Sequence, residues 1–115
     1  MYTPTYKHTK EKYYCEIILS MLPNEPCCIN SRDLAANTGL KPRDVRFVIQ
    51  KLRDAGHPIC ATPEKGYWIA QYSSDMNDTI NKLKSHISNV QATLDALLEA
   101  QQKLKDNERG GYHDN

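Results

Sequence analysis

Residues 30–52 constrain the fold most, because turn-forming residues separate two segments of helical pattern. Asn30 can cap a short helix, since its side chain can accept a hydrogen bond from an amide of the first turn. Gly39 can adopt the left-handed backbone that ends this helix, and Leu40 can plug the turn. Pro42 suits the first turn of a second helix, where its missing N–H is not needed. This stretch therefore predicts a helix-turn-helix.

The second helix, residues 42–53, has one apolar side and one side rich in cations. The cationic side has the composition of a helix that contacts DNA bases in the major groove. Arginine can form paired hydrogen bonds with guanine, glutamine can do so with adenine, and an aromatic ring can touch a thymine methyl group. Lysine and arginine at the margins would contact phosphates. The expected DNA-binding residues in this region are Lys41, Arg43, Arg46, Phe47, Gln50, Lys51 and Arg53.

Phe47 is the only phenylalanine of the chain, and the helical period places it on the outward side. Two explanations are open at this point. Either Phe47 meets a base or a partner protein, or the N-terminal segment folds over it. For any single outward arginine, simple exposure to solvent is the competing interpretation.

After the helix-turn-helix, the sequence predicts a β-hairpin. Residues 59–61 favour one strand, residues 63–66 a turn, and residues 67–69 the return strand. Such a hairpin after a helix-turn-helix is typical of a winged helix. Lys65 at the tip would reach a phosphate or the minor groove, or else is only an exposed turn residue. Because side chains alternate along a strand, one of Tyr67 and Trp68 should close the core.

The part of the chain before residue 30 predicts one further helix. Residues 1–8 form an irregular arm in this interpretation, and Thr9 caps a helix over residues 10–22. Its inner side consists of Tyr14, Ile17, Ile18, Met21 and Leu22. Residues 27–29 are expected to form a short strand.

Part of the pattern resembles a known family. Residues 39–54 with Gly56, and the series Thr62, Pro63, Lys65, Gly66, Tyr67 and Ile69, look like the N-terminal winged-helix domain of the bacterial biotin operon repressors. The resemblance covers residues 29–70. It implies DNA binding through residues 42–53 and through the wing around Lys65. Phe47 and Val48 stand where polar residues are usual, and we expect no ligase domain, so biotin chemistry and effector sensing are not carried over. In its small size the chain also resembles small regulators of phages and mobile elements.

From Ser73 the pattern changes to a heptad repeat. Ser73 or Ser74 can cap a helix over residues 75–106, roughly 48 Å long at 1.5 Å per residue. Ile mostly at a and Leu mostly at d favour a parallel two-stranded coiled coil, although Leu98 could support more strands. The competing interpretation is a helix that folds back on its own domain. The expected oligomerisation residues are Met76, Ile80, Leu83, Ile87, Val90, Leu94, Leu97 and Leu104.

These elements predict a mainly α protein with a small β-hairpin wing. The expected parts are an N-terminal arm (1–8), a winged helix-turn-helix domain (9–72), a coiled-coil helix (73–106) and a flexible tail (107–115). Net charge agrees with this division, since residues 1–70 carry 10 Lys/Arg against 7 Asp/Glu and residues 71–115 carry 5 against 7. The positive excess therefore lies with the helix-turn-helix.

Several classes of function lack their sequence signals. There is no apolar run of about 20 residues and no secretory leader pattern, so we expect a cytoplasmic protein without a membrane partner. Cys15, Cys27, Cys28 and Cys60 match no metal-ligand spacing and are expected to be free, mostly buried thiols. No nucleophile constellation or phosphate-binding glycine loop is present. We therefore expect neither an enzyme nor a metal or cofactor.

The function that follows is sequence-specific binding of double-stranded DNA by a homodimer. A repressor of transcription is the simplest form of it, because a bound dimer can occlude polymerase. One alternative is a protein-interaction module that grasps a partner through Phe47. Another is an organiser of replication origins.

Overall fold

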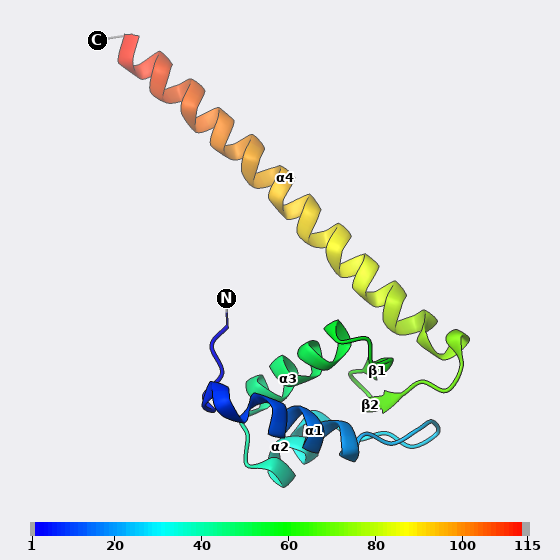
Figure 1. Cartoon of the computed structure of the whole chain (residues 1–115). Coiled ribbons are helices and arrows are strands. Elements are labelled where there is room, and N and C mark those ends of the chain that lie inside the picture. The colour runs from blue at the N-terminus through cyan, green and yellow to red at the C-terminus, as the bar shows by residue number, and fades with distance from the viewer. Residues whose placement is uncertain (1, 114–115) are drawn as a thin grey trace. The chain divides into compact units, whose positions relative to one another are not determined.

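The computed structural model describes residues 2–113 and the side chains of residues 2–109. The chain divides into two units, Met1–Thr79 and Ile80–Asn115. It is mainly α-helical with one small antiparallel hairpin, which confirms the fold class expected from the sequence (Figure 1). The elements are η1 (His8–Lys10), α1 (Glu11–Met21), α2 (Ser31–Thr38), α3 (Pro42–Asp54), β1 (Ile59–Thr62), β2 (Gly66–Ile69), η2 (Ser73–Met76) and α4 (Asn77–His113).

The turn between α2 and α3 forms through the residues that predicted it. The side chain of Asn30 accepts a hydrogen bond from the amide of Asp33 at 2.8 Å, which caps α2. Gly39 ends α2 with a φ of 74°, in the left-handed region that glycine adopts without strain. Leu40 is buried in the turn, and Pro42 occupies the first turn of α3. The arrangement of α2, α3 and the hairpin is compatible with a winged helix-turn-helix.

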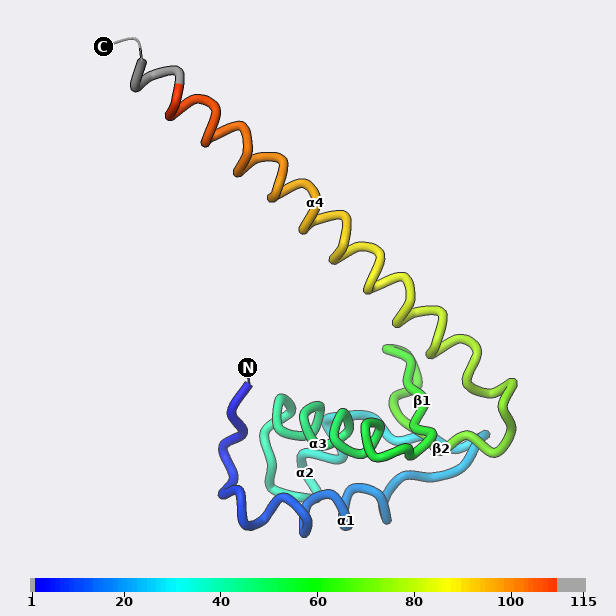
Figure 2. Tube along the Cα trace, turned by 45° about the horizontal axis from the view of Figure 1, so that its top comes forward, coloured from blue at the N-terminus to red at the C-terminus, as the bar shows by residue number. Residues whose placement is uncertain are grey.

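The core of the first unit lies where α1, α2 and α3 pack together (Figure 2). Ile18 of α1 and Leu22, directly after α1, fill it, whereas Tyr14, Ile17 and Met21 are only half-buried. The remaining buried apolar residues of this core are Leu34, Ala35, Leu40, Val45, Val48, Ile49, Leu52 and Ile59. Packing against α1 and α2 therefore fixes the orientation of α3.

The first helix differs from the prediction at its start. Thr9 lies inside the 3-10 turn η1 and does not cap α1, which begins at Glu11 after Lys10 without a side-chain cap. The helix ends at Met21, and Leu22 has extended backbone. The expected boundaries, residues 10–22, were thus one residue too wide at each end.

In the hairpin, Ile59 pairs with Ile69 and Cys60 with Trp68. Trp68 is the buried member of the two neighbouring aromatic residues, and Tyr67 is half-buried. The prediction of a strand over residues 27–29 was wrong, because only Ile29 pairs there, in an isolated antiparallel bridge with Tyr67. This bridge joins the segment before α2 to the hairpin.

The start of the long helix belongs to the first unit. Asp75 accepts hydrogen bonds from the amides of Gln71 and Tyr72 at 3.2 and 3.0 Å, so the cap is Tyr72 rather than Ser73 or Ser74. Thr79 is 8% exposed, and its hydroxyl accepts a hydrogen bond from the amide of Ala61 at 3.1 Å. The first unit thus extends through Thr79, past residue 72, where the sequence placed the domain boundary.

The second unit is the remainder of α4, a helix of 37 residues in all. The helix continues to His113, past residue 106, where the sequence ended the coiled-coil helix. Residues 114–115 of the expected tail lie outside the described residues. Among the described residues, none of the helices is long and apolar enough to cross a membrane.

Candidate nucleic-acid interface

Most of the side chains expected to bind DNA are carried on one side of α3. The other side of this helix is buried in the core through Val45, Val48, Ile49 and Leu52. At 3.6 residues per turn, the positions between these four point away from the core, as does Arg43 one turn before Phe47. We call this side the outer face of α3, which consists of Arg43, Arg46, Phe47, Gln50 and Lys51. Phe47 is half-buried and the other four are exposed.

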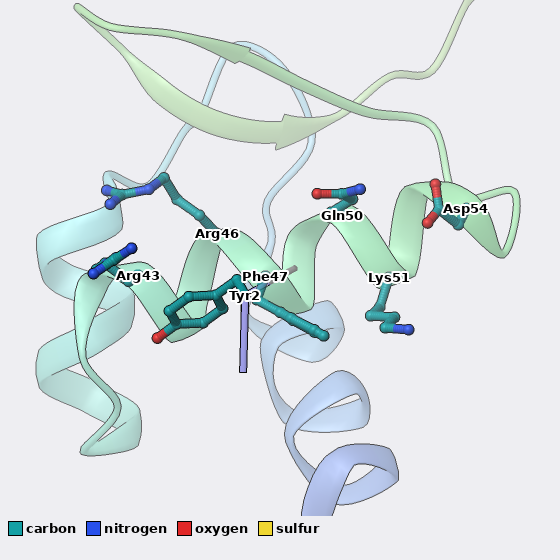
Figure 3. A pocket seen from close by; sticks show the side chains of 7 residues that line it. All are labelled: Tyr2, Arg43, Arg46, Phe47, Gln50, Lys51 and Asp54. Carbon is teal, nitrogen blue, oxygen red and sulfur yellow. The ribbon is translucent and has the colours of Figure 1, made fainter. Parts of the chain in front are cut away.

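An open hollow of about 490 Å³ lies over the outer face. All five residues of the face line it, together with Tyr2 and Asp54. Figure 3 shows these side chains around α3, with the Tyr2 ring beside Phe47. The structure therefore brings five of the predicted DNA-binding residues to one surface.

Phe47 is partly covered by the N-terminal segment. The rings of Tyr2 and Phe47 pack with their centroids 5.8 Å apart and their planes tilted by 50°. The N-terminal segment thus folds over part of Phe47, as one of the two explanations from the sequence had it, but the ring still lines the hollow and can also meet a ligand there. The segment is an arm, as expected, but it is tied to α3 through side-chain contacts.

The tie is Asp44, a residue that sequence reasoning missed. Its carboxylate is 0% exposed, although it stands in the first turn of α3. It accepts hydrogen bonds from the hydroxyl of Tyr2 at 2.5 Å, from the amide of Thr5 at 3.1 Å and from the hydroxyl of Thr5. The sequence shows only an acidic residue in the first turn of a helix. The helix dipole favours an acidic residue at that place, so this signal does not indicate a buried carboxylate.

These hydrogen bonds also set the charge of the site. Burial by itself would raise the pKa of the Asp44 carboxyl, but hydrogen bonds from Thr5 and Tyr2 outweigh it and hold the pKa below its usual range. The hydrogen bond from Tyr2 raises the pKa of the Tyr2 phenol, because the protonated phenol can donate to ionised Asp44 and the phenolate cannot. At neutral pH the site therefore holds a carboxylate beneath a neutral phenol.

Two cations of the outer face lie against the two rings. The guanidinium of Arg43 is 4.9 Å from the centroid of Tyr2, and the ammonium of Lys51 is 5.2 Å from that of Phe47. Cations at such distances are attracted by the negative face of an aromatic ring. The surface is thus an aromatic pair with a cation on each ring, next to Arg46 and Gln50.

The other three predicted DNA-binding residues have different surroundings. Lys41 is exposed at the N-terminal end of α3, and Lys65 is exposed in the turn between the two strands. Arg53 is half-buried and its Nε donates a hydrogen bond to the carbonyl of Ile59 at 2.9 Å. Arg53 therefore links α3 to β1, and we leave it out of the proposed interface.

The expected oligomerisation stripe is exposed along α4, apart from its first member. Met76 is half-buried and belongs to η2 in the first unit. The exposed fraction of the large apolar residues of α4 ranges from 40% at Ile80 to 66% at Ile87. The other exposed apolar residues of this helix are Leu83, Val90, Leu94, Leu97, Leu98 and Leu104.

Comparison with known proteins found no match. This holds for protein-family models, for curated protein sequences and for solved structures.

Among the residues that the structure describes, no three His, Cys, Asp or Glu side chains are grouped so that they could hold a metal ion. All four cysteines are free thiols. Cys60 is buried and Cys15 half-buried, but Cys27 and Cys28 are exposed, so the prediction of mostly buried thiols was wrong for this pair. The pair lies in the loop between α1 and α2, where the segment leaves the core.

Proposed function

We propose that this protein binds double-stranded DNA in a sequence-specific manner as a homodimer, and that it acts as a transcriptional repressor. The observation that carries the proposal is the outer face of α3. Four exposed polar or cationic side chains and one aromatic ring project from the second helix of a helix-turn-helix, and a hairpin with a lysine at its tip follows. This is the set of groups with which a winged helix contacts DNA.

In the proposed complex, α3 enters the major groove with its outer face toward the bases. Arg43, Arg46 and Gln50 are the candidates for hydrogen bonds to base edges, since arginine pairs with guanine and glutamine with adenine. Lys41, directly before α3, and Lys65, in the turn of the hairpin, are exposed and would contact phosphates. Phosphate contacts would supply affinity and base contacts would supply specificity.

The apolar stripe of α4 supports the dimer. Residues from Ile80 to Leu104 expose apolar side chains at heptad spacing, and such a stripe is stable in water when a second helix covers it. Two copies joined in this way would carry two DNA-binding units. The second unit would then bind at high effective concentration, which raises affinity without new contacts. A dimer on its site would repress transcription by excluding polymerase.

A protein partner in place of DNA is the competing function, and the surroundings of Phe47 speak against it. Its ring is half-buried beneath Tyr2, and Lys51 lies over it. Interface anchors are commonly aromatic residues that enter an apolar pocket of the partner. The Phe47 ring has a cation of its own chain next to it, which would have to enter the apolar pocket of a protein partner as well. The negatively charged groove of DNA accommodates such a cation more easily.

The dependence of binding on salt tests the proposal. The full chain would be titrated against a fluorescent random-sequence duplex at several salt concentrations. The logarithm of the binding constant should fall linearly with that of salt, by about 0.9 for each phosphate contact. Lys65→Ala should reduce this slope by about 1. Lys84→Ala, on the long helix, is the matched control and should leave the slope unchanged. No binding to DNA, or binding that salt does not affect, would exclude the proposal and favour a protein partner.

A further inference from the structure

The aromatic pair is the one apolar part of a surface that is otherwise polar. Tyr2 and Phe47 contribute two rings to the hollow over α3, and its other lining residues are Arg43, Arg46, Gln50, Lys51 and Asp54. Arg43 lies over the Tyr2 ring and Lys51 over the Phe47 ring, so each ring of the apolar patch has a cation next to it. Any ligand of the outer face therefore meets an apolar patch flanked by charge.

The patch is held in place by the buried carboxylate beneath it. Asp44 takes three hydrogen bonds from Tyr2 and Thr5, and hydrogen bonds to an ionised group are about twice as strong as those between neutral groups. Releasing the arm would leave that carboxylate buried without its donors or expose it beside the DNA. These hydrogen bonds hold the ring of Tyr2 against the outer face of α3.

The major groove offers one group that suits such a patch. Among the exposed edges of the base pairs there, the 5-methyl group of thymine is the apolar one, and the others are hydrogen-bond donors and acceptors. A donor or acceptor pressed against two rings would lose its water without gaining a partner, which is unfavourable. A methyl group has no hydrogen bonds to water to lose, and its contact with the rings buries apolar area.

We propose that Tyr2 and Phe47 together form a contact surface for the 5-methyl group of thymine, which specifies a T·A pair at one position of each half-site. This inference rests on the proposed function, because it requires the outer face of α3 to lie in the major groove. It adds Tyr2 to the interface as a residue that determines specificity, and it assigns Asp44 and Thr5 the role of positioning Tyr2.

The test uses the unmodified protein and modified DNA. In a duplex enriched by selection from a random library, each thymine is replaced in turn by deoxyuridine, which removes only the methyl group. At one thymine of each half-site the replacement should weaken binding about fourfold, as expected for the loss of one buried methyl group. A duplex with cytosine at that position should be bound more weakly than the duplex with thymine. Replacing this cytosine by 5-methylcytosine should raise the affinity about fourfold, again because one methyl group is buried.

Variants then identify the side chains. Phe47→Ala and Tyr2→Ala should each abolish the difference between thymine and deoxyuridine at that position. Tyr2→Phe keeps the ring but loses the hydrogen bond to Asp44, so it should retain a smaller difference than the natural protein. Lys65→Ala, at the hairpin tip, is the matched control, and should weaken binding to both duplexes equally. Thermal melting of each variant separates loss of the contact from loss of the fold, and the deoxyuridine series needs no variant at all.

The outcomes separate the inference from the proposed function. If the protein binds a selected sequence but no deoxyuridine replacement weakens binding, the inference is wrong and the proposed function stands. The same conclusion follows if Phe47→Ala and Tyr2→Ala keep the full preference for thymine. If no duplex is bound at all, both are wrong.

Discussion

Ile29 and Tyr67 exchange two backbone hydrogen bonds, one from the amide of Ile29 to the carbonyl of Tyr67 at 2.9 Å and one in the reverse direction at 2.7 Å. This pair fastens the hairpin to the segment that leads into α2. The approach is close because Gly66 precedes Tyr67 and has no side chain. A Cβ atom at Gly66 would collide with the carbonyl oxygen of Ile29 and lie 2.7 Å from the Cα of Asn30.

Gly66→Ala should therefore destabilise the first unit strongly. Gly56→Ala is the matched control, since both glycines have φ near 100° but a Cβ at Gly56 meets no atom within 4 Å. The control carries only the strain of a left-handed backbone, about 1–2 kcal/mol. Gly66→Ala adds a steric clash and should lose about 1–3 kcal/mol more in free energy of unfolding. Urea denaturation followed by the fluorescence of the buried Trp68 measures both, and equal losses would contradict the account.

Asp44→Ala should destabilise the first unit by about 3 kcal/mol, because it removes a buried charged acceptor of three hydrogen bonds. Asp54→Ala removes an exposed carboxylate at the other end of the same helix and should change stability by less than about 0.5 kcal/mol. The free energy of unfolding from urea denaturation compares the two. A small effect at Asp44 would mean that the arm does not hold the carboxylate in solution.

The stability difference between the natural protein and Asp44→Asn should depend on pH. Hydrogen bonds from Thr5 and Tyr2 hold the pKa of Asp44 in the folded state below that of the unfolded chain, despite its burial. The unfolded chain then takes up its proton first as pH falls, so stability from this group is complete above about pH 4 and is lost as pH falls further. The advantage over Asp44→Asn should thus be constant near neutrality and shrink in acid. An advantage that persists unchanged down to pH 2 would contradict this explanation.

Ile87→Asp should break self-association through α4. The isoleucine is 66% exposed in the single chain, and a charge there would enter the apolar seam of a coiled coil. Ser88→Asp places the same charge on the neighbouring polar side and serves as the control. Sedimentation velocity should find dimers for the natural protein and for Ser88→Asp, and monomers for Ile87→Asp. A natural protein that sediments as a monomer at all concentrations would remove the dimer from the proposal.

The parts of this fold that the sequence predicted are those with local signals. Gly39 and Pro42 mark a turn between two helices by their own backbone preferences, whatever surrounds them. The heptad spacing likewise describes a helix and an apolar stripe within one segment. The exposed stripe agrees with that pattern, while its partner stays a prediction.

The parts that escaped prediction depend on residues far apart in the chain. Asp44 has its hydrogen-bond partners about 40 positions away, at Tyr2 and Thr5, so its burial leaves no trace in the helical pattern. Arg53 looks like one more cation of an outward helix, but its bond to the carbonyl of Ile59 depends on how the chain turns after α3. Both cases changed the candidate interface, by adding Tyr2 to it and removing Arg53.

The measurement that tests the central claim most directly is selection of bound duplexes from a random library. The natural protein would be compared with the double variant Arg43→Ala/Arg46→Ala, which removes two cations of the outer face and leaves the core intact. We predict that the natural protein enriches one palindromic motif, whose half-site spacing reflects the dimer, and that the double variant enriches none. If no motif is enriched by the natural protein, or if the double variant enriches the same motif equally well, the outer face of α3 is not a sequence-specific DNA-binding surface.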